Sequence, residues 1–124
     1  MTRKEFGERG EYLARLFLEK KGYLFIRSNY VIKGGEIDLI MQENDEIVFL
    51  EVKTRTVASA KAFGRGANAV NAEKIKRIRR TARQFLREET KLTKDLLPRF
   101  DVIELYFDDE FDTKVRILHH PCAF

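Results

Sequence analysis

The sequence predicts one α/β domain in which a mixed β-sheet is flanked by helices. Helical and strand patterns follow one another along the chain in the order α-β-β-β-α-β-β. Two apolar runs, residues 36–41 and 47–55, enclose a short polar stretch, which is the pattern of a β-hairpin. A length of 124 residues suffices for one hydrophobic core and not for two. We therefore expect a single domain over residues 1–124.

Composition narrows the class of protein and its compartment. Hydrophobic residues make up 44% and charged residues 35% of the chain, which is typical of a folded domain with a charged surface. The single cysteine, Cys122, has no partner for an intrachain disulfide, which favours a reducing compartment. No apolar run reaches the about 18–20 residues of a membrane span, and the N-terminus lacks a signal-peptide core. We expect a cytoplasmic protein with no membrane partner.

Residues 3–21 are expected to form the first helix, which ends at Gly22, a residue type common just after helices. Its apolar face is formed by Phe6, Gly10, Leu13, Ala14 and Phe17. Glu11 lies at the border of that face, between small residues, where its carboxylate can reach over the sheet toward Asp38. The alternative is an ordinary carboxylate in water at the edge of the helix.

The next segment is predicted to be a strand followed by a turn. Residues 23–26 form a short apolar run, the polar residues 27–29 interrupt it, and residues 30–32 are candidates to resume it. Gly34 and Gly35 then turn the chain into the hairpin. A phosphate-binding glycine loop is the less favoured alternative, because no helix begins after the two glycines.

Charged residues alternate along both strands of the predicted hairpin. Glu36 and Asp38 share one face of the first strand, and Glu51 and Lys53 share one face of the second. The other faces are expected to be wholly apolar, and Ile37 and Leu39 lie on one of them. A turn of two or four residues sets Asp38 opposite Glu51 and Glu36 opposite Lys53.

Opposed carboxylates indicate a metal site. Directly opposed residues have Cβ atoms about 4.5–5.5 Å apart, where two like charges destabilise a sheet. A Mg²⁺ ion between Asp38 and Glu51 would reverse that effect, since it takes oxygen ligands from one or two carboxylates plus water. Lys53 is then near enough to touch a metal-bound water or a phosphate. The alternative is a surface hairpin whose charges face solvent.

The two strands resemble the PD-(D/E)xK nuclease superfamily, in which an Asp on one strand is followed by Glu-x-Lys on the next. The sequences Gly-Glu-Ile-Asp-Leu-Ile at residues 35–40 and Phe-Leu-Glu-Val-Lys-Thr-Arg at residues 49–55 more narrowly resemble the YraN-like family of small bacterial proteins. Gly-Glu-Tyr-Leu-Ala at residues 10–14 and Arg-Phe-Asp at residues 99–101 are similar to the same family. One departure is an isoleucine rather than a proline before Asp38.

This resemblance covers nearly the whole chain and implies a restriction-endonuclease-like core and a metal-dependent nuclease. Asp38 and Glu51 would hold Mg²⁺, for which Mn²⁺ can substitute. The carbonyl of Val52 would be a third ligand, and Glu11 would bind directly or through water. Lys53 would orient the attacking water or stabilise the transition state.

Positive charge is concentrated in one part of the chain. Residues 53–94 contain thirteen Lys or Arg and three Glu, a net charge of +10, whereas the remainder carries −6. Such segregation favours a polyanionic partner, and DNA is the partner that we expect. Arg55, on the second hairpin strand, is a candidate contact. So are Lys61 and Arg65 in the small-residue stretch 56–68, which is either a mobile binding loop or a simple connector.

A second helix is predicted at residues 71–89. Its core stripe is Ile75, Ile78, Ala82, Phe85 and Leu86. Its remaining surface is basic, with Lys76, Arg77, Arg80, Arg83 and Arg87. A solvated helix face usually mixes charges of both signs, so phosphate binding is favoured over plain solubility.

The C-terminal part is predicted to contain a loop at residues 91–98 and strands at 100–107 and 113–118. Asp101, at a strand start, is interpreted as structural. The residues His119, His120 and Cys122 are interpreted as a tail, because no second cluster of metal ligands accompanies them.

The function that these features favour is metal-dependent hydrolysis of phosphodiester bonds in DNA, branched DNA included. Two alternatives remain open: a non-catalytic nucleic-acid-binding module with the same fold, and an assembly protein that binds an acidic partner through its basic helix. The intact Asp38, Glu51 and Lys53 favour the enzyme. Substrate structure and oligomeric state, a homodimer included, stay open.

Overall fold

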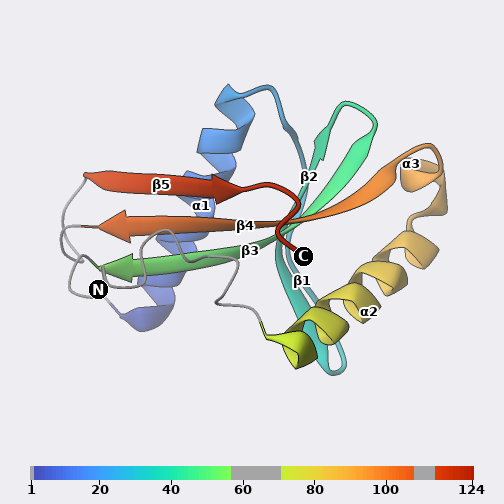
Figure 1. Ribbon diagram of the computed structural model, residues 1–124, viewed down its shortest axis with the longest axis horizontal. Helices are drawn as coiled ribbons and strands as arrows, with labels where there is room; N and C mark the ends of the chain where they lie inside the picture. The colour runs from blue at the N-terminus through green and yellow to red at the C-terminus, as the bar shows by residue number, and fades with distance from the viewer. Residues whose placement is uncertain (1, 57–70, 108–113) are drawn as a thin grey trace.

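The computed structural model describes residues 2–56, 71–107 and 114–124 (Figure 1). The elements are α1 (Arg3–Lys20), β1 (Leu24–Ile32), β2 (Gly35–Glu43), β3 (Glu46–Thr56), α2 (Ala72–Glu88), α3 (Thr90–Thr93), β4 (Leu97–Phe107) and β5 (Val115–His120). The predicted order α-β-β-β-α-β-β is confirmed, and within these ranges the four-residue α3 is the one addition. No helix of the described ranges is long and apolar enough to cross a membrane.

The five strands form one mixed sheet in the order β1-β2-β3-β4-β5. β3 and β4 are parallel, and the other neighbouring pairs are antiparallel. The parallel pair requires a crossover connection, and α2 lies in that connection. α1 packs on one face of the sheet, whereas α2 packs on the other (Figure 1). The α/β fold class is therefore as predicted.

α1 and α2 each cover a separate hydrophobic core, as the spacing of their apolar residues predicted. Ala14 and Leu18 of α1 pack with the side chains of one sheet face. Ile78, Ala82 and Phe85 of α2 pack with those of the other. Both helices start at a capping residue whose side chain accepts a backbone N–H, and at α1 this is Thr2 in a capping box with Glu5.

Close to Asp38, the side chains of β2 stop alternating regularly between the two faces of the sheet. Ile37 packs in the core beneath α2, whereas Leu39 packs in the core beneath α1. The expectation that both belong to one face is therefore wrong at this point, because β2 does not alternate regularly there. Asp38 lies at this irregularity, between Ile37 and Leu39.

Gly10 lets α1 approach the sheet near the end of β3. A Cβ atom at this position would stand 2.0 Å from the Thr54 hydroxyl oxygen, far inside van der Waals contact. Glycine is thus required for this close approach. The contact brings the neighbouring Glu11 toward the part of β3 that carries Glu51.

Three strand assignments differ from the prediction, and one of them is β4, which begins at Leu97 rather than at residue 100. β1 is continuous through residues 27–29, with an irregularity in its pairing between Phe25 and Arg27 and a positive φ of 52° at Asn29. β5 extends to His120, so the interpretation of residues 119 and 120 as a tail is wrong. The physical reason is that two buried carboxylates of β4 need partners from this strand.

Candidate active site

Asp38 and Glu51 lie where the ladder between β2 and β3 ends. The turn has two residues, 44 and 45, and the pairs run from Glu43–Glu46 to Leu39–Leu50. Asp38 and Glu51 are next in this register, which is the predicted one.

The predicted pairing of Glu36 with Lys53 lies beyond the end of the described ladder and is not formed. At this point the Asp38 carboxylate replaces a backbone acceptor, and its Oδ2 accepts the Val52 N–H at 2.8 Å. The side chain of Asp38 is thus fixed against the backbone of β3, beside Glu51.

The surroundings of Asp38 make its ionised form costly. Burial, followed by the negative charge of Glu51, raises its pKa to about 8, although the Val52 N–H acts in the opposite direction. Glu11 and Glu36 add further negative charge. At neutral pH the Asp38 carboxyl is therefore largely protonated unless a cation joins it.

This donor set suits a hard divalent cation. Mg²⁺ commonly binds through one or two carboxylates and keeps several waters or substrate phosphates as its other ligands. Such a cation would let Asp38 and Glu51 be ionised side by side, which burial and their mutual repulsion oppose in its absence. Within the described residues no group of three or more Asp, Glu, His or Cys side chains is arranged to hold a metal. Water and phosphate oxygens would complete the coordination.

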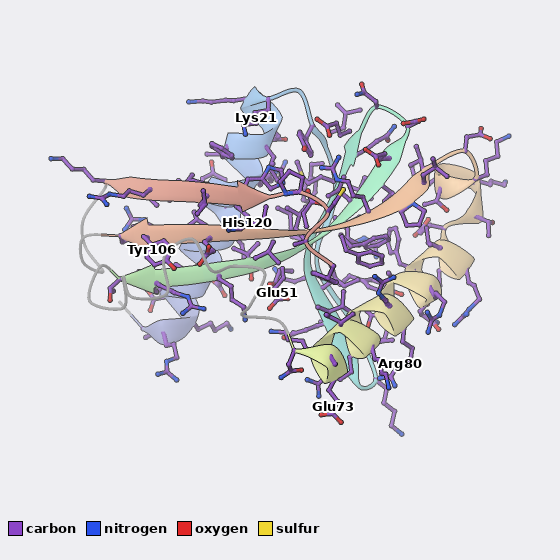
Figure 2. All side chains as sticks on the ribbon, viewed as in Figure 1. Lys21, Glu51, Glu73, Arg80, Tyr106 and His120 are labelled. Atoms are coloured by element: carbon purple, nitrogen blue, oxygen red, sulfur yellow. The ribbon has the colours of Figure 1, made fainter. Side chains whose placement is uncertain are left out.

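Two lysines converge on one oxygen of Glu51. The Lys53 ammonium lies 3.2 Å from Glu51 Oε1, and the Lys74 ammonium lies 2.6 Å from the same atom. Figure 2 shows Glu51 on the side of the sheet that faces the first turn of α2. Lys74 thus ties α2 to the predicted site.

The lysines differ in their affinity for a proton. Burial and the neighbouring Lys74 lower the pKa of Lys53. Burial opposes the charge of Lys74, but its hydrogen bonds to Glu51 and Lys53 and the negative charges of Glu51 and Asp38 together outweigh burial and raise the pKa of Lys74. Lys53 is therefore the ammonium that gives up its proton more readily.

Lys74 was not among the predicted site residues, although the sequence carried a signal for it. It precedes Ile78 by four residues and therefore lies on the inward side of α2. A lysine on the inward side of a helix is partly removed from water, so its charge needs a carboxylate partner on the element that the helix covers. Its charge alone does not distinguish it from the other basic residues of the segment, whereas its position on the helix does.

Glu11 approaches the site from α1 and is half-buried. Burial raises its pKa, a hydrogen bond with Asn29 lowers it, and the charges of Glu36 and Glu51 raise it further. The alternative of a solvated carboxylate at the helix edge does not describe this environment.

β4 places another carboxylate beside the predicted site. Glu104 pairs in register with Lys53 and is fully buried. It accepts a hydrogen bond from the Tyr106 hydroxyl at 2.7 Å, and the His120 Nε2 lies 2.8 Å from its other oxygen. A lone Glu within the apolar run of the predicted strand was the signal for it in the sequence.

Asp101 is structural, as interpreted from the sequence. It is fully buried and lies 2.8–2.9 Å from two guanidinium nitrogens of Arg99. Burial opposes its charge, but hydrogen bonds from His119 and Arg99 lower its pKa overall. This network lies near the start of β4 and has no contact with Lys53 among the interactions of the described residues.

The predicted DNA contacts divide into three groups. Four lie on the exposed side of α2, where they line a hollow of about 280 Å³ with Arg79: Lys76, Arg77, Arg80 and Arg83. Arg55 is a half-buried residue of β3. Lys61 and Arg65 lie outside the described residues.

Arg80 has a structural contact that the sequence did not indicate. Its guanidinium donates a hydrogen bond to the Gly34 carbonyl at 2.8 Å and so ties the turn between β1 and β2 to α2. Figure 2 shows this side chain on the outer side of α2. Replacement of Arg80 would therefore remove a contact that supports the turn as well as a positive charge.

We expect Asp38→Asn to stabilise the metal-free protein at neutral pH by about 1–3 kcal/mol. The parent carboxyl is protonated in the fold up to about pH 8 but ionised in the unfolded chain above about pH 4. The parent should therefore lose stability as pH rises between those values, whereas asparagine removes this loss and still accepts the Val52 N–H.

Thermal melts in EDTA between pH 5 and 9 provide the measurement. The melting temperature of the variant should exceed that of the parent by several degrees at pH 8 and approach it at pH 5. A constant difference across this range would contradict the raised pKa of Asp38.

The mixed sheet, the two covering helices and the carboxylates at the end of the β2–β3 ladder define a restriction-endonuclease-like α/β protein. Comparison with known sequences gives the family. The model of the uncharacterised protein family UPF0102 matches residues 10–105, and the chain belongs to this family. The resemblance to the YraN-like family is thereby confirmed, since UPF0102 and YraN denote the same PD-(D/E)xK-like family.

Relatives match over almost their full lengths. A UPF0102 protein of Alkaliphilus oremlandii is 43% identical over 98% of both chains. One of Caldanaerobacter subterraneus is 38% identical over 100% of this chain and 98% of its own. A more distant one, of Vibrio campbellii, is 34% identical over 85% of this chain and 84% of its own. Their names describe no activity.

Proposed function

We propose that this protein is a metal-dependent nuclease that hydrolyses phosphodiester bonds in DNA. The observation that carries the proposal is the partly buried pair Asp38–Glu51, with Lys53 two residues further along β3. A module that only binds phosphate has no need for two adjacent carboxylates, because both repel the ligand. A site that holds a cation for phosphate hydrolysis needs them.

The residues of the chain have distinct parts in this proposal. Asp38 and Glu51 would hold the cation, with the Val52 carbonyl and Glu11 as further ligands, directly or through water. When bound, Mg²⁺ supplies Lewis-acid activation of water and neutralises negative charge on the phosphate. Lys53 stabilises the charge that develops as the water oxygen bonds to phosphorus and the bond to the leaving oxygen breaks. The basic side of α2 holds the flanking phosphates.

One observation favours the non-catalytic alternative. The Lys74 ammonium already neutralises Glu51 at 2.6 Å, which a metal-free binding protein would also require. The two functions differ in the fate of bound DNA: a nuclease would cleave it in the presence of a divalent cation, whereas a binding module would leave it intact.

Incubation of the purified protein with duplex, single-stranded and branched DNA tests the proposal. We expect cleavage with Mg²⁺ or Mn²⁺ and none in EDTA. Salt-sensitive binding to these DNAs without cleavage of any of them would overturn the nuclease and favour the binding module. Branched and single-stranded substrates belong in the panel because the sequence leaves the substrate structure open.

A further inference from the structure

A groove of about 570 Å³ lies between the β1–β2 hairpin and the first half of α2. Figure 1 shows the turn of this hairpin beside the start of the helix. The described residues that line the groove are Val31, Ile32, Gly34, Gly35, Glu36, Lys74, Arg77 and Ile78. Its volume falls in the range of about 300–1,000 Å³ that is usual for small-ligand sites.

Close packing holds the two walls of the groove together. Arg80 of α2 donates to the Gly34 carbonyl at the turn, where φ is 84° and a glycine is favoured. A Cβ atom at Gly35 would stand 2.1 Å from the Thr81 hydroxyl oxygen, so hairpin and helix are in direct contact there. Contacts between the hairpin and α2 therefore hold the groove in shape.

Two lining residues connect the groove to the candidate active site. Lys74 lines the groove and its ammonium lies 2.6 Å from Glu51 Oε1. Glu36 also lines the groove, and it stands two residues before Asp38 on β2. A ligand in the groove that carries a phosphate can thus present it to Lys74, next to the two carboxylates.

The lining combines two kinds of chemistry. Lys74 and Arg77 supply positive charge, against the single carboxylate of Glu36. Val31, Ile32 and Ile78 supply an apolar wall, and Val31 is 64% exposed. A free inorganic anion does not need the apolar wall, and an apolar peptide does not need the two cations. A nucleotide, with a phosphate and an apolar base face, uses both.

We propose that this groove binds an unpaired nucleotide of the DNA strand whose neighbouring phosphate enters the Asp38–Glu51 site. Inside a duplex each base is stacked on both sides, so only an unpaired base can turn its face to the groove wall. The described lining contains no aromatic side chain, so contact with the base is apolar packing that tolerates any base. The choice of DNA as ligand rests on the proposed function.

Binding without metal tests the groove independently of cleavage. We compare Val31→Glu with Leu24→Glu, because both replace an exposed apolar residue of β1, 64% and 63% exposed, and add the same charge. Leu24 is not among the groove residues. Fluorescence anisotropy in EDTA is measured with a single-stranded thymidine decamer and with a duplex of the same length.

Val31→Glu should weaken binding of the single strand about tenfold, and Leu24→Glu less than about twofold. On the duplex the two variants should agree within about twofold. Equal losses of single-strand affinity would overturn the proposal. If Val31→Glu selectively weakens binding of the single strand but the parent protein never cleaves DNA, the nuclease proposal fails and the proposal that the groove binds an unpaired nucleotide is retained.

A second pair of variants covers the case in which glutamate disturbs the edge strand. Arg77→Gln removes a charge from the groove, and Arg83→Gln removes one from the same exposed hollow on α2 but outside the groove. Arg77→Gln should weaken binding of the single strand at least about threefold more than Arg83→Gln does. Equal effects would show that only long-range attraction acts at this helix, and the groove proposal would fall.

Discussion

Asp38→Asn and Glu51→Gln are each expected to reduce metal-dependent DNA cleavage at least a hundredfold, as an order of magnitude, while the protein stays folded. Each change removes a charged oxygen ligand from the predicted cation site. Asparagine at position 38 keeps the acceptor for the Val52 N–H, which preserves the end of the β2–β3 ladder. Lys53→Ala should also lose cleavage, because it removes the ammonium beside the reacting phosphate.

DNA binding should separate from cleavage in these variants. In EDTA the two carboxylate variants should bind DNA as well as the parent or better, since neither change removes a positive charge and Glu51→Gln removes a negative one. Asp45→Asn makes the same chemical change in the turn of the same hairpin and should cleave like the parent. Cleavage rates equal to the parent's in Asp38→Asn and Glu51→Gln would show that the active-site assignment is wrong.

Asp38→Asn is expected to raise the stability of the metal-free protein and to reduce cleavage. The two effects together are stronger evidence for a functional role of Asp38 than either effect alone. A residue that lowers stability and is needed for activity is a hallmark of a functional site, because selection for folding alone would remove it. If Asp38→Asn both stabilises the metal-free protein and abolishes cleavage, its carboxylate is present for chemistry.

The basic side of α2 should supply affinity that falls steeply with salt. Deleting one phosphate-binding charge flattens the slope of log K against log salt by about 0.7–0.9, so deleting three should reduce it by roughly 2–3. Lys76, Arg77 and Arg83, changed together to Gln, are the best choice, because these side chains line the exposed hollow on α2. Arg80 is kept, since it holds the turn at Gly34.

A salt titration of the parent and this triple variant, on one duplex and one junction, measures the slopes. The control variant replaces three exposed lysines outside α2 with Gln, namely Lys20, Lys91 and Lys94. Circular dichroism should be the same for all three proteins, because Gln keeps helix propensity. Identical slopes for the two triple variants would show that this side of α2 does not contact DNA. The assembly protein with an acidic partner would then be favoured.

Much of the fold was predictable because it depends on local periodicity. A repeat of two residues fixed the faces of β3, and a two-residue turn fixed the register that sets Asp38 beside Glu51. A repeat of 3.6 residues identified the buried sides of α1 and α2. Where β2 departs from regular alternation, between Ile37 and Leu39, the same reasoning gave the wrong face.

The sequence by itself thus determined the order of the elements, the core stripes and the pair Asp38–Glu51 with Lys53. Only the tertiary structure decided which distant groups meet them. Lys74 reaches Glu51 across 23 residues of chain, and Arg80 reaches Gly34 across 46. His119 and His120 become partners of buried carboxylates only because β5 pairs with β4. Such contacts depend on where a helix or strand docks, and the energy of docking is spread over the whole core, so no short sequence pattern encodes it.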